Sequence, residues 1–270
     1  MKARRRFGQH FLQPEWAAKV LTALAPVPED TFLEIGPGTG VLTLPLAARV
    51  GRVIAIEIDR DLAADLSGRL PPNATVFAAD FLDVDVGALL PADAGAIRVA
   101  GNLPYNVSSP ILRRLFELHE TDERLRDATL MLQREVADRI TAPPGTRDYG
   151  VLTVAAARHA RIERVFNLPP GAFRPAPKVR SSLIRLHFRR GYDRILAPSS
   201  LEPLVRAVFG QRRKRIANAL RPFAASVGAK AEAALEKAGI EAGRRPETLS
   251  LDEFLSLARA VDEEARHPGI

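Results

Sequence analysis

The stretch "TFLEIGPGTG", residues 31–40, joins an apolar run to a glycine-rich turn. Its first half is apolar or β-branched and predicts a buried strand. The glycines at Gly36, Gly38 and Gly40 let the backbone turn sharply and approach a ligand closely, because they carry no Cβ. The dinucleotide-binding pattern would place a further glycine where this chain has Val41. The stretch therefore predicts a strand followed by a ligand-binding loop, with a purely structural turn as the alternative.

Similar apolar runs recur along the chain, separated by segments with helical spacing. They cover residues 52–58, 74–80, 96–102 and 128–133, and a later run covers residues 178–188. Strands that alternate with helices form mostly parallel sheets covered on both faces. Ligands of such sheets bind at the carboxyl ends of the strands, near the point where the strand order reverses.

The last third of the chain changes character. Residues 189–200 predict a linker, because turn formers and charges interrupt every periodicity. Four helices are expected beyond it, at residues 201–208, 211–220, 229–238 and 251–261, with breaks at Gly210, Pro222, Gly239 and Pro246. We expect two domains, residues 1–190 and residues 191–270.

Composition excludes several kinds of chemistry. The 270 residues include no cysteine, so disulfides, thiolate zinc sites and cysteine nucleophiles are ruled out, and nothing in the sequence suggests a metal site. The basic N-terminus is not followed by an apolar segment, so we expect a cytoplasmic protein without a membrane span. The net charge is +7, and Lys and Arg exceed Asp and Glu by nine between residues 180 and 222. Such a region attracts phosphate backbones, although a solvated arginine-rich surface explains it equally well.

Acidic side chains end the next two predicted strands. Glu57 could accept hydrogen bonds from both hydroxyls of a ribose, the role of acids in nucleotide sites of this topology. Asp80 could accept from an adenine amino group while Phe81 packs against the ring. The alternatives are a solvated glutamate and an aspartate that caps a turn or helix.

The stretch "GNLPYN", residues 101–106, ends the fourth predicted strand. An aromatic amine such as that of adenine is a poor nucleophile, because its lone pair is delocalised into the ring. The side-chain oxygen of Asn102 and the carbonyl of Leu103 could accept the two amine hydrogens, so that the lone pair points at a methyl donor. Pro104 would fix the backbone and Tyr105 would stack on the base. Taken in isolation, four such residues favour a strand-ending turn, because Asn and Pro are turn formers.

The four sites follow successive strands, and parallel topology brings their ends into one cleft. The spacing of the glycine loop resembles that of S-adenosylmethionine-dependent methyltransferases. Nearly the whole chain resembles the ribosomal RNA adenine dimethyltransferases, which are related to the erythromycin-resistance methyltransferases. The resemblance rests on the motifs "RFGQHFL", "EIGPGTG", "EID", "AAD", "GNLPY", "FRPAPKVRS" and "FGQRRKRIANAL". It implies a Rossmann-like α/β domain with a mostly parallel seven-stranded sheet, followed by a small helical domain that binds RNA.

The resemblance also implies roles for individual residues. Contacts to S-adenosylmethionine fall to His10, Leu12, Gly36, Gly38, Glu57, Asp80, Phe81 and Asn102. The target adenine would be engaged by Asn102, Leu103 and Tyr105, with Phe173 on its other face. Two departures affect these sites: His10 stands where the family often has asparagine, and Ala176 interrupts a run of prolines. An imidazole can still donate one hydrogen bond, and the loop around Ala176 is expected to loosen slightly.

The same resemblance implies that the basic region binds ribosomal RNA. Arg212, Arg213, Lys214 and Arg215 are expected on one helix, as phosphate contacts that read no base. The hypothesis is a monomeric enzyme that dimethylates two adjacent adenosines of small-subunit ribosomal RNA, free or in a pre-ribosomal particle. The alternatives are an enzyme acting on large-subunit RNA and a non-catalytic RNA-binding assembly factor on the same fold.

Overall fold

The computed structural model describes residues 9–189 and 197–266. Contacts divide the chain into two compact units. The first comprises residues 1–137 and 160–189, and the second comprises residues 138–159 and 190–270. The segment 138–159 therefore packs with the C-terminal helices, although it lies between strands of the first unit in the sequence.

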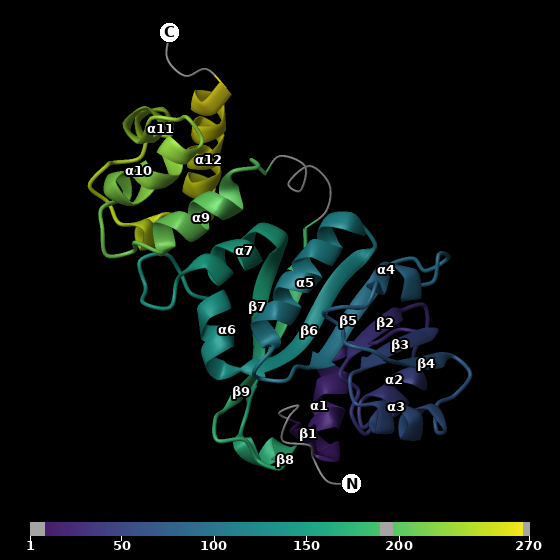
Figure 1. Ribbon diagram of the computed structural model, residues 1–270. Helices are drawn as coiled ribbons and strands as arrows, with labels where there is room; N and C mark the ends of the chain where they lie inside the picture. Colours follow the sequence, from purple (N-terminus) through teal and green to yellow (C-terminus); the bar gives the residue numbers. More distant parts are fainter. Residues whose placement is uncertain (1–8, 190–196, 267–270) are drawn as a thin grey trace. The chain divides into compact units, whose positions relative to one another are not determined.

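A seven-stranded sheet forms the centre of the first unit (Figure 1). Its strands are β2 (Thr31–Ile35), β3 (Arg52–Glu57), β4 (Ala74–Ala78), β5 (Ile97–Asn102), β6 (Leu125–Gln133), β7 (Ala160–Leu168) and β9 (Ser181–Phe188). They lie in the order β4-β3-β2-β5-β6-β9-β7, and β9 runs antiparallel to both of its neighbours. The predicted α/β fold with a mostly parallel sheet is confirmed.

The strand order reverses between β2 and β5, which pair in parallel in register from Thr31 to Ile35. Every residue of β2 is buried, so this strand is covered on both faces. The unit's helices are α1 (Pro14–Leu24), α2 (Thr43–Ala47), α3 (Arg60–Ser67), α4 (Val86–Leu89) and α5 (Ser108–Thr121), and α6 (Arg134–Ile140) spans the boundary between the units. The end of β2 is thus the expected place for a ligand.

A second, two-stranded sheet ties the N-terminal segment to a distant part of the same unit. It pairs β1 (Phe11–Leu12) with β8 (Phe173–Arg174), and Leu12 lies opposite Phe173. The short helix η2 (Pro170–Ala172) precedes β8. Leu12 and Phe173 both belong to the apolar cluster formed with α1 and β2.

A charged network is buried near the other end of β5. The guanidinium of Arg98 lies 2.7 Å from the Asp30 carboxylate and 3.0 Å from that of Asp127, and it donates to the Leu24 carbonyl at 2.8 Å. Arg98 also lies over the ring of Phe32, 4.9 Å from its centroid. The network joins the end of α1 to three strands, and its charges are compensated inside the protein.

The second unit is helical in the part that the structure describes. It contains α7 (Val151–His159), α9 (Leu201–Phe209), α10 (Ile216–Ser226), α11 (Ala231–Lys237), η3 (Pro246–Thr248) and α12 (Leu251–Arg266). Its core includes Phe254 and Leu257 of α12, both fully buried.

Two sequence predictions for this unit are wrong. The second of its predicted helices begins at Ile216 and not at Gln211, because residues 211–214 form a turn closed by a hydrogen bond from Lys214 N to Gln211 O. Pro222 does not end that helix, which continues to Ser226. Burial of Leu220 and Ala224, on either side of the proline, stabilises the helix through it.

Candidate active site

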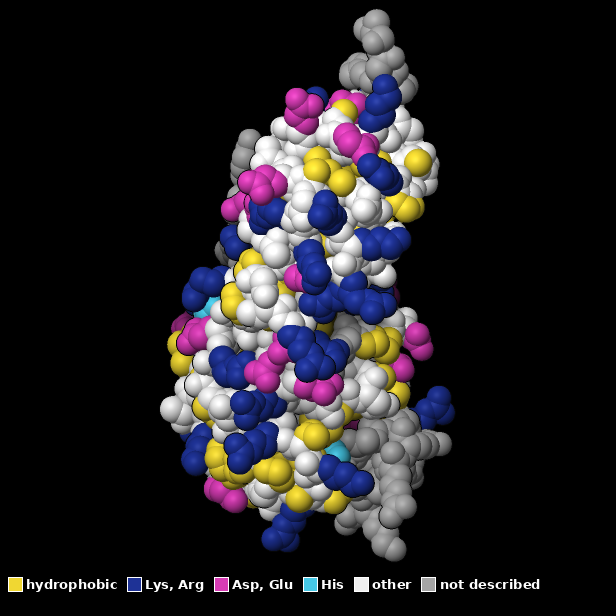
Figure 2. All heavy atoms as spheres, turned by 90° about the vertical axis from the view of Figure 1, so that its left-hand side faces the viewer, with side chains coloured by type: hydrophobic (Ala, Val, Ile, Leu, Met, Phe, Trp, Pro, Cys, Tyr) yellow, Lys and Arg dark blue, Asp and Glu magenta, His cyan; other side chains and the backbone are white. Residues whose placement is uncertain are grey.

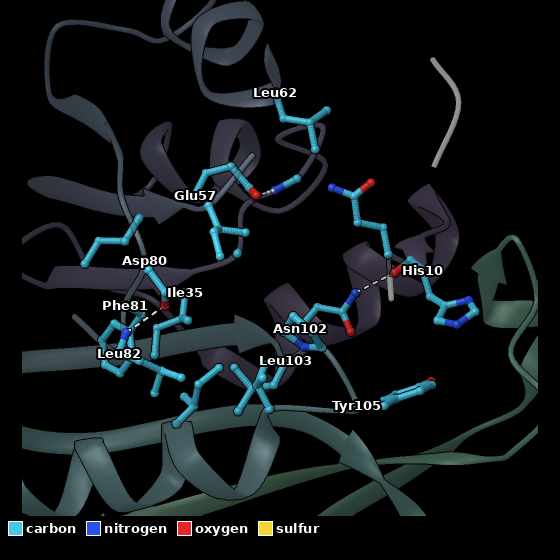
Figure 3. A pocket seen from close by; sticks show the side chains of 18 of the residues that line it. His10, Ile35, Glu57, Leu62, Asp80, Phe81, Leu82, Asn102, Leu103 and Tyr105 are labelled. Carbon is cyan, nitrogen blue, oxygen red and sulfur yellow. Dashed lines mark hydrogen bonds between the residues drawn. The ribbon is translucent and has the colours of Figure 1, made fainter. Parts of the chain in front are cut away.

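A pocket opens at the carboxyl ends of β2, β3, β4 and β5 (Figure 3). The hollow contains about 840 Å³ free of protein atoms, a volume that includes space open to solvent. Its walls include Gln9, His10, Phe11, Gly36, Gly38, Glu57, Leu62, Asp80, Phe81, Asn102, Leu103, Pro104 and Tyr105. The structure therefore brings together residues from the four successive strand ends selected from the sequence.

The glycine loop is shaped to meet the acid on the next strand. Gly38 has a φ of +58°, which L side chains rarely adopt, and a Cβ on it would lie 3.2 Å from the Phe11 ring. Its N–H donates to Glu57 Oε2 at 2.9 Å, while Glu57 Oε1 accepts from Asp59 N at 2.9 Å. Burial raises the pKa of Glu57. Each carboxylate oxygen has a second lone pair, so Glu57 can still accept from ligand hydroxyls.

Asp80 and Phe81 follow β4 on the same wall. Asp80 Oδ1 accepts from Leu82 N at 2.9 Å, which makes it a turn cap as well as a pocket residue. Phe81 is 4% exposed and presents an apolar surface to the pocket. Asp80 can therefore cap the turn and bind a ligand at the same time, because the cap uses only its Oδ1.

Asn102 is held in one orientation by the N-terminal segment. Its Nδ2 donates to the His10 carbonyl at 2.7 Å, which leaves Oδ1 as an acceptor (Figure 3). Leu103 N donates to Met131 O at 3.2 Å, and the Leu103 side chain is fully buried, so the backbone here is fixed. A donor in the ligand is the natural partner of the Asn102 oxygen.

Tyr105 stands beside this amide. Its hydroxyl shares a 2.7 Å hydrogen bond with Ser181 Oγ at the start of β9, and its ring stacks on His10 with centroids 5.3 Å apart. Burial raises the pKa of Tyr105. The phenol is therefore neutral around pH 7, and its ring offers an uncharged stacking surface.

Two residues expected at the site lie elsewhere. Leu12 and Phe173 are 4% and 1% exposed, and neither lines this pocket. Their pairing across the β1–β8 ladder turns both side chains into the apolar cluster. Leu12 borders a smaller hollow that shares Gly36, Gly38 and Asn102 with the main pocket. Stacking of Phe173 on a base would require it to leave the core.

The four basic residues occupy a different setting from the expected one. They precede α10 and do not lie on a helix, and Arg215 is the extended residue at the helix N-terminus. Arg213, Lys214 and Arg215 are exposed, whereas Arg212 is half-buried and donates to Arg147 O at 3.1 Å. A turn that continues directly into an amphipathic helix has few sequence signals to mark its end.

Glu34 is a buried acid next to the site that sequence reasoning missed, and it lines the same smaller hollow as Leu12. It lies in β2 one residue before the loop and is 2% exposed, and its Oε2 has no hydrogen-bond partner among the described residues. Burial raises the pKa of Glu34 to about 7, partly offset by Thr43, and the Glu57 charge adds to the rise. The signal was an acid inside an otherwise apolar strand.

Other kinds of site find no support in the described part of the chain. Within residues 9–189 and 197–266, no group of three or more His, Asp or Glu side chains is placed to hold a metal ion. Over the same residues, no helix has the length and apolar character needed to cross a bilayer.

The strand order and the glycine loop joined to Glu57 define a Rossmann-like methyltransferase. More narrowly, the chain belongs to the ribosomal RNA adenine dimethylase family, whose model matches residues 1–263. It is 43% identical over 263 residues to ribosomal RNA small subunit methyltransferase A of Aromatoleum aromaticum, covering 96% of this chain and 94% of that protein. The protein of the same name from Acinetobacter baylyi is 41% identical over 261 residues, covering 95% and 92%.

Solved structures agree with this family. The crystal structure of a dimethyladenosine transferase from Plasmodium falciparum superposes with a TM-score of 0.79 at 24% identity, over 94% of this chain and 98% of that one. The crystal structure of the 23S rRNA methyltransferase ErmE gives a TM-score of 0.66 at 29% identity, over 93% and 99%. The first of these likenesses supports the fold alone.

Proposed function

We propose that this protein transfers methyl groups from S-adenosylmethionine to the exocyclic amines of two adjacent adenosines near the 3′ end of small-subunit ribosomal RNA, two groups to each. The observation that carries the proposal is the fixed amide of Asn102 beside Tyr105. The names of the relatives at 40–43% identity support the small subunit as the source of the RNA.

The pocket residues fit the proposed cofactor. Glu57 would accept from the ribose hydroxyls, and the free oxygen of Asp80 would accept from the adenine amino group beside Phe81. Gly36 and Gly38 line the pocket, and the positive φ of both shapes the loop that a ligand would approach. S-adenosylmethionine would supply the methyl group when bound.

The protein's own part in the reaction is to prepare the amine. In the first transfer to each adenosine, Asn102 Oδ1 accepts one N6 hydrogen and the Leu103 carbonyl accepts the other, so that the nitrogen becomes pyramidal and its lone pair turns toward the methyl donor. In the second transfer a single N6 hydrogen remains, and one of these two oxygens accepts it. Tyr105 stacks on the base once it has left its own stack. The methylated nitrogen is acidic and loses its proton late, so no strong general base is needed.

Replacing Asn102 by alanine tests the mechanism. We expect loss of dimethyladenosine, measured by mass spectrometry of small-subunit RNA after incubation with the cofactor, while calorimetry still detects cofactor binding. Asn106→Ala is the matched control, because Asn106 is exposed and does not line the pocket. Retained dimethylation by the Asn102 variant would contradict the mechanism. Large-subunit RNA, incubated in parallel, tests the alternative substrate.

We also propose that residues 1–190 act as a methyltransferase domain and that residues 191–270 act as an RNA-binding domain. Figure 2 shows basic side chains prominent on the face it presents. The exposed residues Arg213, Lys214 and Arg215 stand at the N-terminus of α10, where the helix dipole adds to their charge. They would contact phosphates without reading bases.

Salt dependence tests these phosphate contacts. Each one should contribute about 0.7 to the slope of log affinity against log salt for single-stranded RNA. Lys214→Gln should lower that slope by this amount, whereas Lys230→Gln, at another exposed position, should change it less. Equal effects of the two substitutions would mean that RNA binding depends on the net charge of the protein and not on contacts at Lys214.

We further propose that the protein acts as a monomer in the cytoplasm, which light scattering and fractionation would test.

A further inference from the structure

The stacking surface of Tyr105 is already covered by a side chain of the same protein. The His10 ring lies on it with centroids 5.3 Å apart and an interplanar angle of 28°. His10 Nδ1 lies 2.6 Å from the Pro175 carbonyl. A carbonyl oxygen only accepts, so Nδ1 carries the proton and the imidazole is held with one face against Tyr105.

The position of His10 conflicts with that of a bound base. In Figure 3 the Tyr105 ring is seen nearly edge-on, with the His10 ring and the Asn102 amide on the same side of it. A base whose amine reaches Asn102 Oδ1 must use that side. Two stacked contacts need about 7 Å between the outer rings, since apolar atoms approach to about 3.5 Å. The separation of 5.3 Å leaves no room for a base between His10 and Tyr105.

We propose that the His10 imidazole occupies, in the RNA-free protein, the place on Tyr105 that the target adenine takes, and that the entering base displaces it. This inference rests on the proposed function, because it assumes a base at Asn102. The aromatic ring and N–H of His10 imitate a nucleobase in shape and polarity. His10 thereby sets how readily a base enters the site.

The two functions of His10 are separable within one residue. Its backbone carbonyl orients Asn102, whereas its ring covers Tyr105. Among the residues that the structure describes, the ring forms one side-chain hydrogen bond, to the Pro175 carbonyl. Rotation of the side chain would therefore free Tyr105 while the Asn102 amide keeps its orientation.

Comparison of His10→Ala with His10→Phe isolates the ring, because both lack Nδ1 and only phenylalanine can stack. The full-length protein is incubated with saturating S-adenosylmethionine and increasing small-subunit RNA. An aromatic stack is worth about a 2- to 10-fold change in equilibrium. His10→Ala should lower the RNA concentration for half-maximal methylation by such a factor, and His10→Phe should not lower it. A rise with His10→Ala, or equal effects of the two variants, would overturn the proposal.

Cofactor affinity and base entry can each be measured apart from methylation. Calorimetry with S-adenosylmethionine detects a direct role of the His10 side chain in cofactor binding. If His10→Ala weakened cofactor binding by a factor as large as its change in the RNA concentration for half-maximal methylation, the displacement role would be overturned. Binding of an RNA fragment with 2-aminopurine at a target position reports base entry by fluorescence. If no variant methylates RNA but His10→Ala binds the probe more tightly, the proposed function fails and the role of His10 stands.

Discussion

Replacing Glu34 by glutamine should raise the free energy of unfolding at pH 8 and have little effect at pH 4. Glu34 is almost completely buried beneath the glycine loop, and its Oε2 has no partner among the described residues. Burial raises the pKa of its carboxyl from the usual 4.5 to about 7 in the folded protein. Glutamine keeps the shape of the side chain and removes its titration.

The sign and size follow from the two protonation states. Between pH 4.5 and about 7 the unfolded chain has released the Glu34 proton while the folded protein still binds it. The unfolded state therefore binds fewer protons, and stability falls as the pH rises through this window. The rise in the pKa of Glu34 from 4.5 to about 7 lowers the free energy of unfolding by about 3 kcal/mol, at about 1.4 kcal/mol for each pKa unit. Above pH 7 the loss is complete and becomes constant.

Urea unfolding of both proteins, at intervals from pH 4 to pH 8, measures this effect. The difference in free energy of unfolding between Glu34→Gln and the parent should move by about 3 kcal/mol in favour of the variant across that range. Glu15→Gln provides the control, because Glu15 is exposed in the first turn of α1. If the difference in free energy of unfolding between the variant and the parent did not vary with pH, the reasoning would be refuted. Effects of the substitution that do not involve titration shift this difference by the same amount at every pH.

Two further predictions concern the framework around the site. Arg98→Met should lower the free energy of unfolding by about 3–5 kcal/mol, because it leaves two buried carboxylates with only the exposed guanidinium of Arg126, about 4 Å away, as a cationic partner. Chemical denaturation measures this, and Arg52→Met, which removes an exposed ion pair, should cost less than about 1 kcal/mol. Gly101→Ala should lower stability by about 1–3 kcal/mol, since its Cβ would lie 2.9 Å from a backbone oxygen of β2. Gly95→Ala is its control in thermal unfolding, as nothing lies within 4 Å there, and equal costs would contradict the packing argument.

The strands that position the site were predictable because each is a nearly continuous apolar run. The strand β7 was missed for the opposite reason. It lies at the edge of the sheet, and its sequence "ARIERVFNL" contains charges at exposed and half-buried positions. The position of β7 in the sheet depends on its pairing with β9, and a local sequence pattern does not predict that pairing. The start of α10 was misplaced for a related reason, because a charged turn and a charged helix face have similar composition.

Within the site, the sequence indicated which residues meet but not how they are oriented. Successive strand ends predict that Glu57 and Asn102 share a cleft, and they do. The hydrogen bonds that fix them, from Gly38 to Glu57 and from Asn102 to His10, depend on loops whose conformation is set by tertiary contacts. The burial of Phe173 likewise follows from a pairing with Leu12, far away in the sequence.

That pairing has a consequence for the order in which the protein is made. A ribosome synthesises Leu12 long before Phe173, so the short ladder between them cannot form until most of the first unit has emerged. The wall of the pocket that contains His10, and with it the orientation of Asn102, depends on this late event. A nascent chain would therefore fold much of its sheet before it possessed a working site. Translation products that end before β8 would lack the site even with all four strand ends present.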